Sequence, residues 1–247
     1  MSILLLTRLR CFMEEIKFKQ RAFWTEWAAR YGDELASVHR YGDIKELEKI
    51  VINIIDKLEM KKDNSVLDAG CGSGVFSSIL YKLTDANLIG MDFSIKHLEI
   101  MREKYPYIET VNGDVTALPF KNETFDKVVC YSVLQFVKPW RDAVAEIIRV
   151  TKRGGKVLLG DIPDRSKRWV LFLISIKKSF MLSFRPIELM KKIRYATIGP
   201  EWQWFNIKDM ISFIEKFHCK ANIIKQPINS QWGTESYRYR IDILIDK

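Results

Sequence analysis

One short segment, residues 66–74, combines an acidic residue with three glycines at alternate positions. Asp68 comes first, and Gly70, Gly72 and Gly74 follow it. Glycine lets a ligand come close to the backbone. The apolar residues around the turn are typical of a buried strand before it and a helix after it. This order of strand, tight turn and helix N-terminus indicates a nucleotide-binding corner.

The charge of Asp68 indicates which nucleotide the corner takes. A dinucleotide would place its pyrophosphate on the helix N-terminus, and a carboxylate this close would repel it. S-Adenosylmethionine (SAM) has no phosphate, and its sulfonium and α-amino groups are both positive. In addition, Val75 stands where the dinucleotide pattern needs glycine or alanine. We therefore expect the corner to bind SAM.

Two more acidic residues follow predicted strands further along the chain. Asp92 lies 22 residues after the first glycine, a distance at which an acid accepts hydrogen bonds from ribose hydroxyls. Asp114 ends the next predicted strand, and we expect it to accept from the adenine amino group. Phe93 and Val115 follow the two acids directly, and we expect both to pack against the adenine ring.

Alternating and continuous apolar runs predict the elements that position these residues. A helix is expected over 44–58, before the first strand, and another after the glycine turn. The expected strands begin at Val66 and cover 87–92, 108–115, 125–132 and 154–161, followed by a helix over 207–217 and strands over 220–226 and 237–245.

With these elements in place, the chain resembles the class I SAM-dependent methyltransferases of the type 11 family. The matching segments are VLDAGCGSG at 66–74, GMDFS at 90–94, NGDVTALPF at 112–120, FDKVVCYSVLQFV at 125–137 and EIIRVTKRGGKVLL at 146–159. Together they cover about residues 45–162 in the family's order. The resemblance implies an enzyme with an α/β, Rossmann-like fold: a seven-stranded, mostly parallel sheet flanked by helices, with a helical cap and an antiparallel last strand.

The resemblance also implies roles for residues of the cofactor site. It places Asp68, Gly70 and Gly72 at the methionine part of SAM, Asp92 at the ribose, and Asp114 with Val115 at the adenine. The full set of expected cofactor residues is Asp68, Ala69, Gly70, Cys71, Gly72, Gly74, Asp92, Phe93, Asp114, Val115 and Tyr131. One departure is that many relatives carry a histidine near Gln135 or Phe136, and this chain has none there.

The length of 247 residues fits one α/β domain with an added cap. We expect an N-terminal cap segment over 1–43, a cofactor-binding core over 44–162, a substrate lid over 163–206, and a C-terminal helix with two strands over 207–247. The resemblance implies that the first segment folds over the cofactor. The apolar run 169–174 favours a buried lid over a helix on a membrane surface.

The net charge and the cysteines indicate which partners and which cellular location to expect. The net charge of +9 is explained either by a solvated basic surface or by attraction to an acidic partner such as an anionic metabolite, nucleic acid or an anionic membrane surface. Four scattered cysteines without paired spacing predict neither disulfides nor a metal site. With no secretory signal and no membrane-spanning run, a cytoplasmic location is expected.

Candidates for a general base are few. His39 lies in the loop before the first core helix, whereas His97 and His218 are expected to be surface or structural residues. Asp161 and Asp164 follow the fifth strand at the edge where ligands bind. Asp164 fits a helix cap equally well. Among nearby aromatics, one of Trp202 and Trp204 is expected in the substrate pocket and Phe205 in the core.

The acceptor is narrowed by what the chain lacks. Residues 131–134 read Tyr-Ser-Val-Leu where methyltransferases of nucleic-acid amines carry Asn/Asp-Pro-Pro-aromatic, so a small-molecule acceptor is favoured. The expected reaction is methyl transfer to a hydroxyl of an anionic, sugar-like or nucleotide-linked metabolite. The alternatives are an RNA or protein methyltransferase, and a SAM-binding scaffold without turnover.

Overall fold

A computed structural model describes residues 3–31, 44–170, 173, 203–226 and 240–247. Its strands are β1 (Ser65–Ala69), β2 (Asn87–Asp92), β3 (Glu109–Asn112), β4 (Phe125–Tyr131), β5 (Thr151–Pro163), β6 (Lys220–Lys225) and β7 (Arg240–Asp246). Its helices are α1 (Ile3–Tyr31), α2 (Ile44–Leu58), α3 (Val75–Thr84), α4 (Ile95–Lys104), α5 (Trp140–Val150) and α8 (Ile207–Glu215), with short 3-10 turns η2 (Leu134–Phe136) and η3 (Arg165–Lys167).

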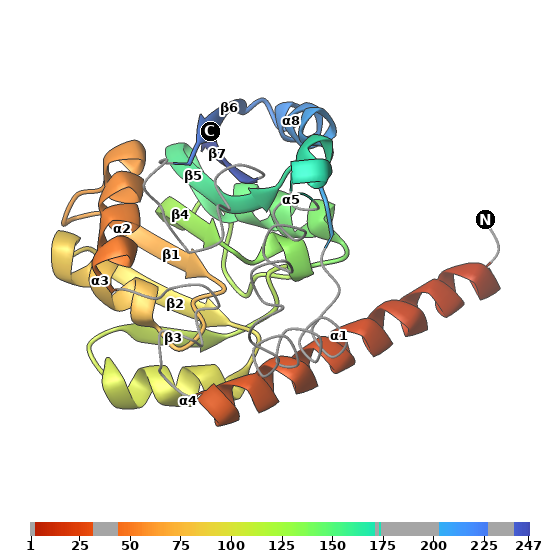
Figure 1. Ribbon diagram of the computed structural model, residues 1–247, viewed down its shortest axis with the longest axis horizontal. Helices are drawn as coiled ribbons and strands as arrows, with labels where there is room; N and C mark the ends of the chain where they lie inside the picture. The colour runs from red at the N-terminus through yellow and green to blue at the C-terminus, as the bar shows by residue number, and fades with distance from the viewer. Residues whose placement is uncertain (1–2, 32–43, 171–172, 174–202, 227–239) are drawn as a thin grey trace.

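The strands form one sheet in the order β3-β2-β1-β4-β5-β7-β6 (Figure 1). The first five strands in this order run parallel to one another, and β7 pairs antiparallel with both β5 and β6. The strand order reverses at β1, so the carboxyl ends of β1 and β4 open a crevice between them. The expected seven-stranded, mostly parallel sheet with flanking helices is confirmed.

Two apolar layers cover the faces of the sheet because successive strand residues point to opposite sides. In β1, Leu67 contributes to the layer with α5 and α8, while its neighbour Val66 contributes to the layer with α2, α3 and α4. In β4, Val128 and Val129 divide in the same way. The apolar face of α2 is buried at Leu47, Ile50, Val51, Ile54 and Leu58, as its 3.6-residue spacing predicts.

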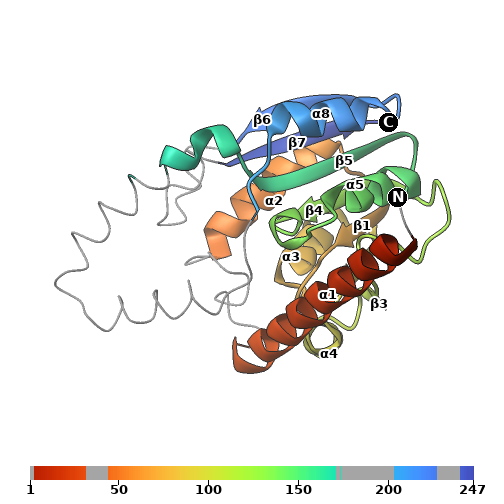
Figure 2. The ribbon, with the colours of Figure 1, turned by 90° about the vertical axis from the view of Figure 1, so that its right-hand side faces the viewer.

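The first described element is one long helix, α1, which lies within the N-terminal segment 1–43 that was expected to form a cap. It packs beside α4 at the β3 edge of the molecule, as Figures 1 and 2 show. Lys17 and Gln20 of α1 bond to Thr116 and Phe136, each about a hundred residues along the chain. The N-terminal segment is therefore attached across the strand ends, where the functional residues lie.

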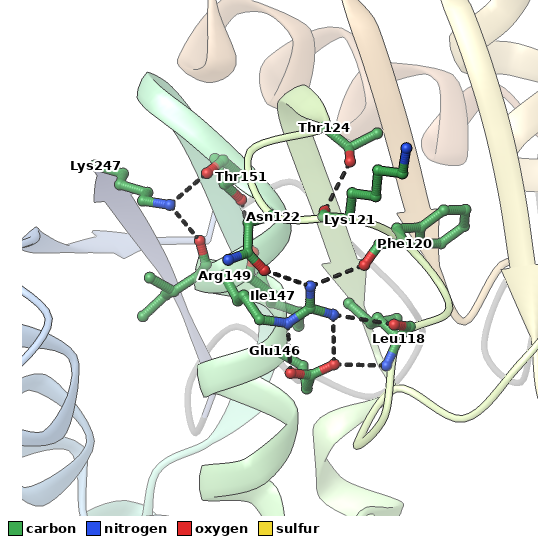
Figure 3. A network of polar contacts seen from close by, with 11 residues as sticks. Leu118, Phe120, Lys121, Asn122, Thr124, Glu146, Ile147, Arg149, Thr151 and Lys247 are labelled. Atoms are coloured by element: carbon green, nitrogen blue, oxygen red, sulfur yellow. Dashed lines mark hydrogen bonds and ion pairs between the residues drawn. The ribbon is translucent and has the colours of Figure 1, made fainter.

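An arginine of α5 fixes the segment between β3 and β4 (Figure 3). Arg149 donates to the carbonyl oxygens of Leu118 at 3.0 Å and Phe120 at 2.8 Å, and to Asn122 Oδ1 at 2.9 Å. Glu146 accepts from the backbone N–H of Leu118 at 2.7 Å while it pairs with Arg149. Asp114 lies near the start of this segment. The Arg149 network fixes the later part of the segment, at residues 118–122.

Some sequence predictions differ from the structure. The third strand ends at Asn112 instead of residue 115, because the chain turns at Asp114, which bridges to Ala117. The buried-lid prediction for 169–174 is wrong for Trp169 and Leu173, which are 61% and 50% exposed. Their four-residue spacing places them on one helical face. The rest of the predicted lid up to residue 202, and the boundary at 43, lie outside the described residues, so the division into segments stays a proposal.

Within the part of the chain that the structure describes, no helix has the length and apolar character needed to span a membrane.

Candidate cofactor pocket

A pocket lies at the carboxyl ends of β1, β2 and β4 and is closed on one side by α1. It brings together nine of the eleven residues expected at the cofactor: Asp68, Gly70, Cys71, Gly72, Asp92, Phe93, Asp114, Val115 and Tyr131. Ala69 and Gly74 do not line it. Residues far apart in the sequence therefore meet at one edge of the sheet, as the strand-end positions of the acids predict.

The glycines of the turn have backbone conformations that other residues rarely adopt. Gly70, Gly72 and Gly74 have φ angles of 93°, 55° and 85°, in the left-handed region. A Cβ on Gly70 would also lie 2.3 Å from Cγ2 of Val133. The turn is tied to the second strand, because the N–H groups of Gly70 and Cys71 donate to the carbonyl of Met91 at 2.7 and 3.0 Å. The backbone of the glycine turn is thus accessible to a ligand in the pocket.

Asp68 is a buried carboxylate whose side-chain partner in the described structure is the hydroxyl of Ser77. Its side chain is 2% exposed and accepts a 2.5 Å hydrogen bond from Ser77 Oγ. Burial raises its pKa to about 7, more than the Ser77 bond lowers it, and the charge of Asp92 adds to the rise. No described lysine or arginine pairs with it. A carboxylate in this situation favours a positively charged ligand group, such as the α-amino group of SAM.

Asp92 connects the glycine turn to the start of α4. One carboxylate oxygen, Oδ2, accepts from the N–H of Gly72 at 2.9 Å, and the other, Oδ1, accepts from the N–H of Ser94 at 2.8 Å. Each carboxylate oxygen has a further lone pair. The geometry leaves Asp92 able to accept from a vicinal diol while it holds the turn.

Asp114 is bound by both its own turn and α1. Its Oδ1 accepts from the N–H of Thr116 at 2.9 Å and from the Thr116 hydroxyl at 2.7 Å. Its Oδ2 lies 2.7 Å from Nζ of Lys17. Burial raises the pKa of Asp114, but the bonds from Lys17 and Thr116 outweigh it, so the pKa lies below its ordinary value. The predicted adenine acceptor is therefore ionised and already meets a cation of α1.

Sequence reasoning missed the individual residues that α1 and α4 bring to the pocket. The Arg21 guanidinium lies 4.2 Å from the centre of the Phe93 ring, and Trp24 lies edge-on to Phe136 at 5.1 Å. His97, expected to be a surface or structural residue, is 5% exposed and lines the pocket, with Nδ1 3.8 Å from Asp92 Oδ1. Its position three residues after the N-cap Ser94 was a usable signal, because this turn follows Asp92 directly.

The predicted general bases are not gathered at the pocket. His39 lies outside the described residues. Asp161 is buried and directed at Arg240, with 2.7 Å between Oδ2 and Nη1, and it does not line the pocket. Asp164 caps η3 by accepting from the N–H of Ser166 at 2.9 Å, which is its structural alternative. His218 is exposed at the end of α8.

The nearby aromatic residues also lie in different places. Phe205 is 3% exposed and belongs to the core, as predicted. Trp204 does not line the pocket, and Trp202 lies outside the described residues. Cys71, Cys130 and Cys219 are buried free thiols. In the described ranges, no three or more His, Cys, Asp or Glu side chains are grouped where they could hold a metal ion.

Comparisons with known proteins agree with this geometry. The family model described as "Methyltransferase domain" matches residues 67–159. A demethylmenaquinone methyltransferase of Renibacterium salmoninarum is 31% identical over 140 residues, which are 57% of this chain and 57% of that protein. An uncharacterized protein of Methanocaldococcus jannaschii is 34% identical over 149 residues, or 60% of each chain. The chain thus spans less than two thirds of the length of these relatives.

Solved structures share the fold at low identity. Geranyl diphosphate C-methyltransferase from Streptomyces coelicolor, in complex with S-adenosyl-L-homocysteine, superposes with a TM-score of 0.64 at 13% identity, covering 94% of this chain and 98% of that one. A SAM-dependent methyltransferase from Thermotoga maritima superposes with a TM-score of 0.57 at 16% identity, covering 91% and 99%. Residues 67–159 thus match a methyltransferase domain, and the strand order agrees with the class I, Rossmann-like fold of SAM-dependent methyltransferases, whose cofactor is SAM.

Proposed function

We propose that the protein transfers a methyl group from SAM to a hydroxyl-bearing, apolar small molecule. The observation that carries the reaction type is the convergence of Asp68, Asp92 and Asp114 with the glycine turn in one pocket. Bound SAM supplies an activated methyl group, which moves from its sulfonium sulfur to the acceptor and leaves S-adenosylhomocysteine. The task of the protein is then to align the two molecules and to exclude water.

The three acids divide the work of holding the cofactor. Asp68, which is buried and pairs with no lysine or arginine of the described ranges, attracts the α-amino group at the β1 end. Asp92 accepts from the ribose hydroxyls with the lone pairs that the backbone bonds leave over. Asp114 accepts from the adenine amino group, and Val115 and Phe93 pack on the ring. Ser73, Gly72 and Cys71 complete the backbone wall of the pocket.

The acceptor class is supported by the pocket wall after β4. Val133, Phe136, Val137 and Pro139 line this wall with apolar groups, which suits an apolar ring better than a sugar or a phosphate. Two lysines line the pocket: Lys17, which is paired with Asp114, and Lys138, which follows Val137 in this wall. Four apolar side chains to one lysine in the wall favour an apolar acceptor over an anionic one. The relatives named demethylmenaquinone methyltransferases support a quinol-type ring as the acceptor.

A proton must leave the acceptor hydroxyl when that oxygen, or a ring carbon beside it, attacks the methyl group. His39, Asp161 and Asp164 stay predictions for this role. Asp161 accepts a hydrogen bond from the pocket-lining Ser132, and Asp164 does not line the pocket.

The test is methyl transfer by the full chain from SAM labelled in the methyl group. Naphthalene-1,4-diol, kept reduced, represents a quinol ring, and uridine diphosphoglucose represents an anionic, nucleotide-linked sugar. We expect labelled product with the diol and none with the sugar nucleotide, and no product from Asp92→Ala. Label in the sugar nucleotide alone would restore the anionic acceptor class, and label in neither would contradict the proposed acceptor.

A further inference from the structure

A polar group stands in the apolar wall of the acceptor end: Ser132, the first residue after β4, lines the pocket. Its neighbour across the sheet is Asp161, because β4 and β5 pair Tyr131 with Gly160 and both chains continue one residue further. Ser132 and Asp161 both have φ angles of 61°. Two adjacent non-glycine residues in the left-handed region store strain, which proteins retain mainly at functional sites.

The hydrogen bonds of Ser132 determine whether its hydroxyl can donate or accept a hydrogen bond toward the pocket. Its Oγ donates to Asp161 Oδ2 at 2.8 Å. The same Oδ2 accepts from Nη1 of Arg240 at 2.7 Å, and Arg240 is fully buried. An ion-paired carboxylate accepts hydrogen bonds, so the only hydroxyl proton of Ser132 is committed to Asp161.

Gln135 makes a second hydrogen bond to the Ser132 hydroxyl. Its Nε2 lies 3.0 Å from the carbonyl oxygen of Ser132 and 2.9 Å from Oγ. A carbonyl oxygen can only accept, so the amide nitrogen must face it, and the same nitrogen donates to Oγ. Gln135 is 1% exposed, which shields this arrangement from water.

One lone pair of Ser132 Oγ is left after these two bonds. Because the proton is held by Asp161, the hydroxyl cannot donate into the pocket. We infer that Ser132 is the residue that holds the methyl acceptor, by accepting a hydrogen bond from the hydroxyl next to the reacting atom. This inference rests on the proposed function and adds to it the residue and the polarity of recognition.

That Ser132 accepts a hydrogen bond, and does not donate one, has a chemical consequence. A ring hydroxyl that donates to Ser132 gains electron density on its oxygen and on the adjacent ring carbon, so it becomes a better nucleophile at either atom. A carbonyl, ether or carboxylate oxygen in the same place would face a lone pair and be rejected. The site therefore distinguishes a reduced, hydroxylated ring from its oxidised or methylated form. Asp161 acts through Ser132 and is a positioning residue.

The test compares two ligands of nearly equal shape, 1-naphthol and 1-methylnaphthalene, by calorimetric binding to the full chain saturated with S-adenosylhomocysteine. One hydrogen bond predicts that the wild type binds the naphthol about three- to tenfold more tightly. Ser132→Gly removes the hydroxyl and also suits the positive φ angle, so folding is retained. We expect it to bind both ligands equally and to keep its affinity for S-adenosylhomocysteine. Ser78→Ala, which removes a buried hydroxyl outside the pocket, is the matched control and should keep the preference.

Two variants test the role of Asp161, and both lose the ion pair with Arg240. In Asp161→Asn, the single amide oxygen can still accept from both Ser132 and Arg240, so the preference for the naphthol should persist. In Asp161→Ala it should disappear.

The outcomes separate the two proposals. An unchanged preference in Ser132→Gly, or equal binding of both ligands by the wild type, would overturn the role of Ser132 and leave the proposed function standing. Binding of neither ligand by the wild type would overturn the acceptor class, and this inference with it.

Discussion

The two ends of the pocket are built in different ways. At the glycine-turn end, the residues expected to face the cofactor come from short segments at the ends of β1, β2 and β3, although Lys17 of α1 also pairs with Asp114 there. At the end after β4, the wall of η2 is held by long-range bonds. Gln20 of α1 donates to the carbonyl of Phe136, and Gln203 donates to those of Leu134 and Val137.

This difference matches what each end must recognise. A cofactor of fixed shape can be bound mainly by short motifs at the ends of neighbouring strands. An acceptor that differs among relatives needs a wall that distant segments can alter without disturbing those motifs. Substitutions at the first end should therefore change cofactor binding alone, and substitutions at the second end should change acceptor binding alone.

The largest expected effect is at the glycine-turn end. Asp92→Ala removes the carboxylate that accepts from Gly72 and Ser94 and that we expect to accept from the ribose. The loss of charged hydrogen bonds should weaken S-adenosylhomocysteine binding about 100-fold, measured by calorimetry. Glu99→Ala, which removes an exposed carboxylate paired with Lys96 on α4, is the control. Equal affinities of the two variants would refute the assignment of Asp92.

A smaller effect at the same end depends on pH. The pKa of Asp68 is raised to about 7 by burial, so the carboxylate is largely protonated at pH 6 and largely ionised at pH 8. Since the ionised form attracts the ligand's α-amino group, S-adenosylhomocysteine should bind about tenfold more tightly at pH 8 than at pH 6. Asp68→Asn should lose this dependence. A variant that kept the wild-type pH profile would show that another group titrates.

The same raised pKa affects stability with the opposite sign. Between the pKa of the unfolded state, 3.8, and about 7, the folded protein binds more protons at Asp68, so its free energy of unfolding falls as pH rises. Asp242, whose pKa is raised by burial to about 6, contributes in the same direction. Ligand binding is thus tightest at pH 8, where these two carboxylates no longer stabilise the free protein.

An effect of similar size is expected at the acceptor end. Phe136→Ala enlarges the apolar wall and should weaken 1-naphthol binding about tenfold. The affinity for S-adenosylhomocysteine should change by less than about threefold, because the glycine turn is untouched. Phe18→Ala, at a ring that is 73% exposed on α1, is the control. A large loss of cofactor affinity in Phe136→Ala would break the separation between the two ends.

Much of the fold and one end of the site could be predicted from the sequence, for a physical reason. The glycine turn with Asp68, and each strand-end acid with the strand before it, form short local patterns, so each pattern is visible in the chain itself. The bounds of α2 and β2 were predicted to the residue. Errors at the ends of other elements came from turns, such as the one that Asp114 forms after β3.

The rest depends on contacts between distant segments. Lys17 meets Asp114 and Arg21 meets Phe93 only because α1 lies across the strand ends. Nothing in the spacing of α1 indicates these partners. Asp161 occupies the strand-end position expected of a ligand-binding acid, yet Arg240, 79 residues later, takes up its carboxylate. Polar groups that are satisfied by distant partners cannot be identified from local patterns.

The central claim is that this pocket is built for SAM and not for a dinucleotide, and thermal unfolding tests it directly. S-Adenosylhomocysteine at about a hundred times its dissociation constant should add about 2.7 kcal/mol and raise the midpoint by about 5–10 °C. NAD at the same concentration should leave the midpoint unchanged, because Asp68 repels a pyrophosphate. A shift with NAD, or none with millimolar S-adenosylhomocysteine, would contradict the account.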